Sequence, residues 1–156
     1  LCGQRALEYL SLSWQQNSAV GRELSVKPDK TAQAVERLLG EVQRLKDRCA
    51  GLEEAEFHRL AEEYRGAGNV LLVQPSMEPD SVRRLCDAVS RTCSGRCAVF
   101  AGTDGGYKYA VIHPEQDITP FMKAMNAALR GRGGGRDGFA QGSAACTEEE
   151  IRRFWA

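Results

Sequence analysis

Histidine is scarce in this sequence, and no cluster of metal-ligating residues is present. The 156 residues contain two histidines, His58 and His113, and neither has a second ligand at the spacing that zinc sites use. Cys93 and Cys97 are close in sequence, but no further ligand pair accompanies them. The sequence therefore predicts no catalytic residues, no metal site and no cofactor in this chain.

Long apolar runs and an excess of either charge are also missing. No stretch approaches the roughly 20 apolar residues that a membrane-spanning helix requires, and the N-terminus lacks the features of a secretory leader. The 21 basic and 21 acidic residues cancel, so a polyanion site has to be local. The six cysteines favour reduced thiols in a chain of this length. We expect a cytoplasmic protein with no membrane partner and, because Leu1 opens directly into helix-like sequence, a piece of a longer protein.

A helical arm is expected before the breaker Gly66-Ala-Gly68. Residues 3–21 favour a first helix, and Pro28 with Asp29 is a typical start for a second, over residues 29–65. Along the second helix apolar residues recur at spacings of three and four, which is a heptad pattern. The residues of this predicted oligomerisation stripe are Val35, Leu38, Val42, Leu45, Cys49 and Leu52. The stripe packs either on the first helix as a helical hairpin or on a second chain, and the sequence leaves both open.

Short apolar runs alternate with helical patterns after the breaker. Strands are expected at 70–74, 97–102 and 107–112, and helices at 78–92 and 118–129. A last helix starts at Thr147, where Glu150 completes a capping box. The predicted fold class is α/β: a long helical hairpin or coiled-coil arm, residues 1–66, followed by a small mixed β-sheet domain with packed helices, residues 67–156.

The most informative local feature is a Gly-rich segment from Gly131 to Gly138, which we expect to be a loop. Consecutive glycines let backbone N–H groups approach a phosphate closely, although neither a Walker loop nor a dinucleotide fingerprint is present. The surrounding residues are basic in an otherwise neutral chain. The candidate nucleic-acid-binding residues are Lys108, Lys123, Arg130, Arg132, Gly133, Gly134, Gly135 and Arg136. The alternative is a tight structural turn with incidental arginines.

Two segments carry a resemblance to a known family. The first reads Leu1-Cys-Gly-Gln-Arg-Ala-Leu-Glu-Tyr9, and it is similar to the Gly-x-Arg-Ala segment after the editing domain of alanyl-tRNA synthetases and AlaX-type editing proteins. The second reads Gly133-Gly-Gly-Arg-Asp-Gly-Phe-Ala-Gln-Gly142, and it resembles the signature of their DHH-associated C-terminal domain. One departure is that Arg136 precedes Asp137, where the family often has proline.

The resemblance covers nearly the whole chain and implies a non-catalytic C-terminal part. In this family the globular domain contacts tRNA, the arm mediates homodimerisation, and Gln141 joins the candidate binding residues because it lies in the matching motif. The parent would be an alanine-tRNA ligase or an aminoacyl-tRNA hydrolase. Its zinc is expected in an upstream editing domain, whose ligand motifs this sequence does not contain.

Two other functions stay open at this point. The same domain type closes DHH phosphoesterases, where the glycines hold nucleotide phosphates and are usually followed by a histidine; this chain has Arg136 there. A purely structural coiled-coil dimerisation module, with an α/β domain that only caps the arm, is the third alternative. Zinc-ligand histidines upstream of Leu1 would favour the editing family, and an Asp-His-His run would favour a phosphoesterase.

Overall fold

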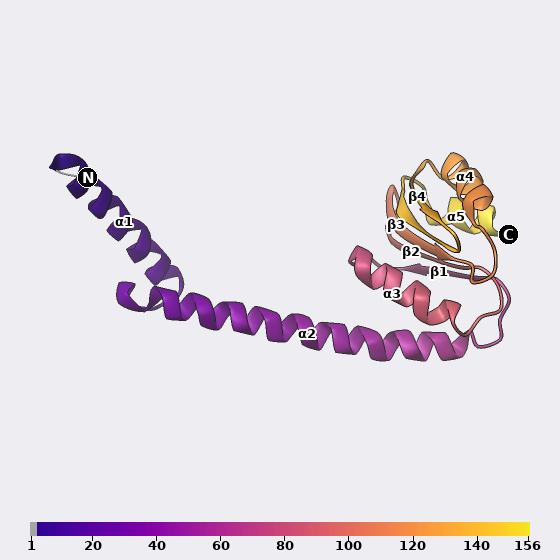
Figure 1. The fold of residues 1–156 in the computed structure, drawn as a ribbon, viewed down its shortest axis with the longest axis horizontal. Coiled ribbons are helices and arrows are strands. Elements are labelled where there is room, and N and C mark those ends of the chain that lie inside the picture. Colours follow the sequence, from indigo (N-terminus) through magenta and orange to yellow (C-terminus); the bar gives the residue numbers. More distant parts are fainter. Residues whose placement is uncertain (1–2) are drawn as a thin grey trace. The chain divides into compact units, whose positions relative to one another are not determined.

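The computed structural model describes residues 3–156, and the chain divides into two compact units, Leu1–Ala50 and Gly51–Ala156. The first unit contains α1 (Gln4–Glu23), the short 3-10 helix η1 (Pro28–Lys30) and the start of α2 (Thr31–Glu63), which continues into the second unit (Figure 1). The long second helix is therefore confirmed. The predicted domain boundary at residues 66 and 67 lies just after α2 and stays a prediction.

A polar corner joins α1 to α2 within the first unit. The Asn17 side-chain amide donates a hydrogen bond of 2.7 Å to the Pro28 carbonyl. The Thr31 hydroxyl donates to the Asn17 carbonyl oxygen at 2.6 Å. Ser25, in the connection, adopts a positive φ of 54°. These local contacts fix the turn between the two helices.

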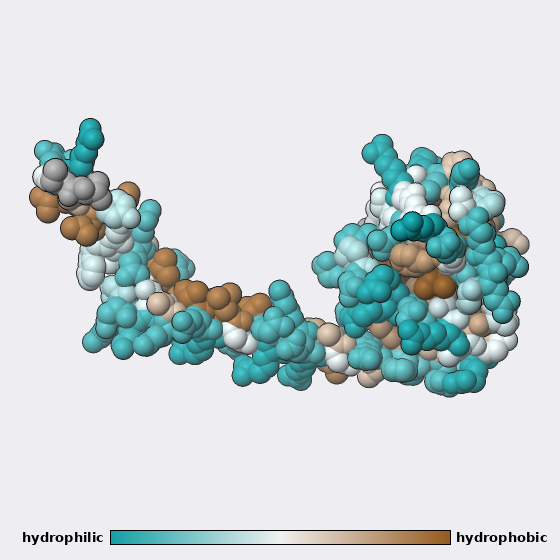
Figure 2. Space-filling model, viewed as in Figure 1, coloured by the Kyte–Doolittle hydropathy of each residue, from teal (hydrophilic) through white to brown (hydrophobic). Residues whose placement is uncertain are grey.

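The heptad stripe of α2 faces solvent. Val35 is 39% exposed, Leu45 50% and Leu52 64%, and Figure 2 shows apolar side chains gathered along one side of the N-terminal part of this helix. Leu7, Leu10 and Trp14 on α1 are also exposed. The exposure does not fit a hairpin in which α1 covers the stripe. Pairing with a second chain stays a prediction.

The second unit is a five-stranded mixed sheet with helices on both faces, as Figure 1 shows. The strand order is β1-β2-β3-β5-β4, and only the β1–β2 pair is parallel. These elements confirm the predicted α/β fold class. Their bounds are β1 Val70–Gln74, α3 Pro79–Ser90, β2 Cys97–Thr103, β3 Gly106–Ile112, α4 Thr119–Ala128, β4 Gly131–Arg136, β5 Phe139–Ala144 and α5 Glu148–Trp155.

Strand alternation produces two apolar cores, one on each face of the sheet. On one face Val99 of β2 packs with Val82 of α3 and with Phe57 from the C-terminal part of α2. On the other face Phe100 packs with Met125 of α4, in a cluster that also includes α5. Because α3 and α4 cover opposite faces, side chains on one strand reach different environments.

The Gly-rich segment is a strand, so the prediction of a loop at residues 131–136 is wrong. Gly131–Arg136 forms β4, paired along its length with β5, and only Asp137 and Gly138 make the turn. Glycine normally weakens a strand, because it raises the conformational entropy of the unfolded chain and has no side chain to pack against its neighbours. Here a Cβ on Gly133 would lie 2.4 Å from the Gln141 carbonyl oxygen and 2.5 Å from the Tyr109 hydroxyl. The close approach of neighbouring groups therefore requires glycine.

Replacing Gly133 by alanine is expected to lower the free energy of unfolding by about 1–3 kcal/mol, because the added methyl overpacks a filled site. Gly134→Ala is the matched control, since a Cβ there meets nothing within 4 Å. Denaturant titration of both variants measures the difference. Equal stabilities would show that β4 does not depend on this contact.

Candidate nucleic-acid interface

Three neighbouring strands bring basic and polar side chains onto one face of the sheet. Directly paired residues in an antiparallel sheet point to the same side. Lys108 of β3 pairs with Ser143 of β5, which pairs with Arg132 of β4, so these three form one row. Further along, Gln141 pairs with Gly134, and Phe139 pairs with Arg136. We call Lys108, Arg132, Arg136, Gln141 and Ser143 the open basic face.

This face lies on the side of the sheet that α3 covers, but α3 packs on β2 and β3 and leaves the β5–β4 side uncovered. All five side chains of the open basic face are exposed. Within residues 3–156, Lys108, Arg132 and Arg136 have no ion-pair partner at 4.0 Å or less. Their charges are therefore available to an external anion.

A groove of about 600 Å³ continues from Arg136 toward α3. Ile112 and Phe139 line it. So do Arg83 of α3 and Arg91, the residue that follows α3, and neither was among the predicted candidates. Both arginines pair with aspartates of α3: Arg83 with Asp80 at 2.8 Å and Arg91 with Asp87 at 2.7 Å. Sequence offers no means of finding them, because such spacing is typical of any solvated helix.

His113 also lines this groove, and its environment is that of a strand-end residue. It is buried, its backbone N–H donates to the Gly138 carbonyl at 2.8 Å, and its Nδ1 accepts from the Glu115 backbone N–H at 3.3 Å. The histidine thereby holds the β4–β5 turn against the end of β3.

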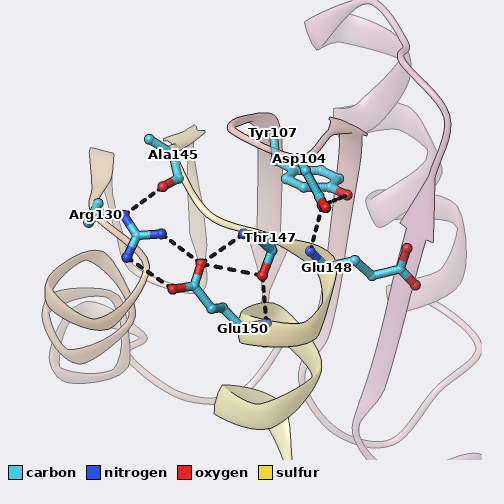
Figure 3. A network of polar contacts seen from close by, with 7 residues as sticks. All are labelled: Asp104, Tyr107, Arg130, Ala145, Thr147, Glu148 and Glu150. Carbon is cyan, nitrogen blue, oxygen red and sulfur yellow. Dashed lines mark hydrogen bonds and ion pairs between the residues drawn. The ribbon is translucent and has the colours of Figure 1, made fainter.

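Arg130 borders the face, but its guanidinium is used within the fold. Its Nε donates to the Ala145 carbonyl at 2.7 Å, and its two terminal nitrogens donate to the Glu150 carboxylate at 3.0 and 2.6 Å (Figure 3). The same carboxylate accepts from the Thr147 backbone N–H at 2.8 Å, in the predicted capping box, which is confirmed. Arg130 therefore ties the start of β4 to the start of α5.

The remaining predicted site residues are divided between the faces. Lys123 lies on α4, which covers the opposite face, so the fold does not bring it to the open basic face. Gly134 pairs with Gln141 on the open side, whereas Gly133 lies against Tyr109. Gly135 alternates with Gly134 and so shares the side of Gly133.

Buried thiols do not form a second site. Cys86, Cys93, Cys97 and Cys146 are buried. Burial is the main cause that raises the pKa of the Cys86 thiol, and the neighbouring Cys97 raises it further. A thiol in this state is a poor nucleophile and metal ligand. Among the described residues, no group of three or more His, Cys, Asp or Glu side chains is placed to hold a metal ion.

No protein-family model matches the chain. In solved structures, RecJ of Thermus thermophilus in complex with Mn²⁺ matches 89% of this chain at 20% identity and a TM-score of 0.57. The Mg²⁺ complex matches 89% at 22% identity and a TM-score of 0.51. The C-Ala domain of Aquifex aeolicus alanyl-tRNA synthetase matches 57% of this chain and 89% of its own length, at 17% identity and a TM-score of 0.48.

The RecJ matches show that the fold is shared, and at these identities they show the fold alone. This chain spans 22% and 23% of the two RecJ chains. In the part of the chain that the structure describes, no helix has the length and apolarity needed to cross a bilayer.

Arg130 and Glu150 generate a prediction on pH. Hydrogen bonding by Arg130 is the main cause that lowers the pKa of Glu150, from 4.5 to about 2. A carboxylate with a lowered pKa contributes stability above its unfolded-state pKa, and the contribution disappears as the pH falls through the folded-state value. Glu150→Gln should therefore unfold at lower denaturant than the wild type at pH 7, and the difference should shrink between pH 4.5 and 2.

Glu149→Gln is the control for this measurement. Among residues 3–156, Glu149 pairs only with Arg153 of its own helix, at 2.7 Å. We expect a smaller change from this substitution. A wild-type advantage over Glu150→Gln that is the same at pH 7 and at pH 2 would contradict the assignment.

Proposed function

We propose that the chain is the non-catalytic C-terminal part of an alanyl-tRNA synthetase family or tRNA-editing protein, that it binds tRNA through the open basic face, and that it pairs through the α2 stripe. The observation that carries the proposal is the placement of Lys108, Arg132 and Arg136 on one uncovered sheet face without acidic partners. The two motifs that resemble the family support it.

The chemistry of the face suits a phosphate backbone. Arginine presents a planar guanidinium that can donate two parallel hydrogen bonds to phosphate oxygens. Arg132 and Arg136 are four residues apart on β4 and so lie about 13 Å from each other along the strand. Such a spacing suits contacts with separate phosphates. Phosphate contacts position a nucleic acid without reading its bases, so this surface contributes affinity rather than sequence specificity.

Measuring tRNA binding at several salt concentrations tests the face. With about three phosphates neutralised, log K should fall with log salt with a slope near −2 to −3, at ~0.7–0.9 per phosphate. Changing Lys108, Arg132 and Arg136 together to alanine should flatten that slope by about the same amount. The matched control changes Lys123, Arg152 and Arg153 to alanine, which removes equal charge from α4 and α5.

The control should keep most of the slope, and both variants should melt as cooperatively as the wild type. If the triple variant of Lys108, Arg132 and Arg136 binds tRNA with the wild-type slope and affinity, the open basic face does not bind tRNA and β4 has a structural role alone. Equal losses in both variants would show attraction by overall charge and not by this face. Tighter binding of single-stranded DNA than of tRNA at the same salt would favour the phosphoesterase alternative.

The purified chain is expected not to hydrolyse mischarged alanine tRNA, with or without added zinc. A zinc-activated water needs about three protein ligands, and no such group occurs among the described residues. Release of the amino acid from seryl- or glycyl-tRNA is the measurement, with a chelator-treated sample as the control. Zinc-dependent release above that control would overturn the non-catalytic assignment.

A further inference from the structure

The α2 stripe ends where α2 begins to pack on the α/β domain. Phe57 and Ala61, further along α2, are buried in the core formed with α3. Glu53 accepts hydrogen bonds from the Ser81 hydroxyl at 2.8 Å and from Arg84 at 2.5 Å. The stripe residues before this junction are exposed, and no part of the described chain covers them.

The residue types along the stripe favour a particular pairing. Val35, Val42 and Cys49 occupy heptad position a, and Leu38, Leu45 and Leu52 occupy position d. In parallel coiled coils, valine at a with leucine at d favours two strands over three or four. A second copy of α2 presents the same series of knobs and holes, so its stripe is complementary in shape to this one.

Charges beside the stripe agree with a parallel orientation. In a parallel pair, position g of one helix faces position e of the next heptad of its partner. Glu41 at g would face Lys46 at e, and Arg48 at g would face Glu53 at e. Each contact joins opposite charges and occurs twice in a symmetric dimer; Glu53 would share its carboxylate between Arg48 of the partner helix and Arg84 of its own chain.

The antiparallel arrangement is less complementary. It joins positions of the same type, g with g and e with e. Glu41 would then face Arg48, but Lys46 would lie beside Leu39, and Glu53 would gain no opposite charge. Within the chain, Lys46 and Arg48 have no ion-pair partner among the described residues, and Glu41 has only a 3.6 Å contact with Arg44. These groups are therefore available to a partner helix.

We propose that two copies of this chain pair through the α2 stripe in parallel and in register, so that the Cys49 thiols face each other. This inference rests on the pairing included in the proposed function and adds its orientation. Helices about 10 Å apart, with Cα atoms ~2.3 Å from each axis, leave facing Cα atoms about 5 Å apart. That separation suits a disulfide. In an antiparallel pair centred on the stripe, the two Cys49 positions would be about 16 Å apart along the axis.

Cross-linking of Cys49 is the direct test. Cys49 is exposed in the single chain, whereas the other described cysteines are buried. Cys2 lies outside the described residues and is replaced by serine. With diamide as oxidant, two thiols each lose a proton, the sulfurs form one S–S bond, and the two electrons and two protons reduce the N=N bond to a hydrazine. The expected product is a disulfide-linked dimer that Cys49→Ser abolishes.

A charge exchange tests the orientation independently. Glu41→Lys should lower the cross-linked yield several-fold, because it places a second positive charge opposite Lys46 of the partner subunit. The double variant Glu41→Lys with Lys46→Glu should restore the yield. In an antiparallel pair the new lysine would face Arg48 in both variants, so the second change would rescue nothing. Recovery in the double variant thus supports only the parallel arrangement.

Two outcomes would overturn the proposal in distinguishable ways. A sample that sediments as a monomer at every soluble concentration and gives no cross-link contradicts pairing altogether, including that part of the proposed function. A second test mixes two chains that both carry Cys2→Ser: one also has Leu38→Cys and Cys49→Ser, and the other keeps Cys49. A cross-link between the cysteine introduced at position 38 of the first chain and Cys49 of the second would show an antiparallel dimer. That result contradicts the orientation and leaves the pairing and the tRNA-binding face in place.

Discussion

Tyr109 lies in the middle of β3, in the core on the α4 side of the sheet, and the contacts of its hydroxyl group connect three elements of the α/β domain. The hydroxyl donates to the Asn126 side-chain oxygen at 2.8 Å, and the Asn126 amide donates to the Gly133 carbonyl at 3.2 Å. Tyr109 is buried, and burial raises the pKa of its phenol. The chain tyrosine–asparagine–backbone thus links β3, α4 and β4 through hydrogen bonds that lie partly away from water, where they are most effective.

This linkage explains why β4 is rich in glycine and still a strand. A side chain at 133 would collide with Tyr109 and with the backbone of β5, so the side of β4 facing α4 has to be bare. The alternate positions point to the other side, where Arg132 and Arg136 meet no such limit. Gly133 and Gly135 therefore lie on one side of the strand and the two arginines on the other, with Gly134 beside the arginines. A structural role of the first side and a binding role of the second do not exclude each other.

Much of the fold could be predicted from the sequence, because those features depend on local patterns. The long helix follows from the periodicity that includes Leu38 and Leu45, and the start of α5 follows from Thr147 and Glu150. The strand at 131–136 is not predictable from local sequence, because it depends on pairing with β5 and on the close approach of Tyr109, while local propensity favours a loop. Such tertiary effects are not visible in a window of neighbouring residues.

The candidate site was predictable only in part for a similar reason. Lys108, Arg132 and Arg136 were identified from local charge, and strand register then places them on one face. Arg130 has the same sequence context, but Glu150 lies 20 residues away and pairs with its guanidinium. Whether a charged side chain is available to a ligand depends on the fold. Composition therefore gives a list of candidate residues, and the structure shows which of them already pair within the chain.

Chemical footprinting of lysines with and without bound tRNA tests the central claim most directly. Lys108 lies on the open basic face and Lys123 on the opposite side of the sheet, and both are exposed and open to acetylation in the free chain. The account predicts that saturating tRNA protects Lys108 while Lys123 reacts as before. Protection of Lys123 with Lys108 still reactive would contradict it, because the nucleic acid would then lie on the face covered by α4.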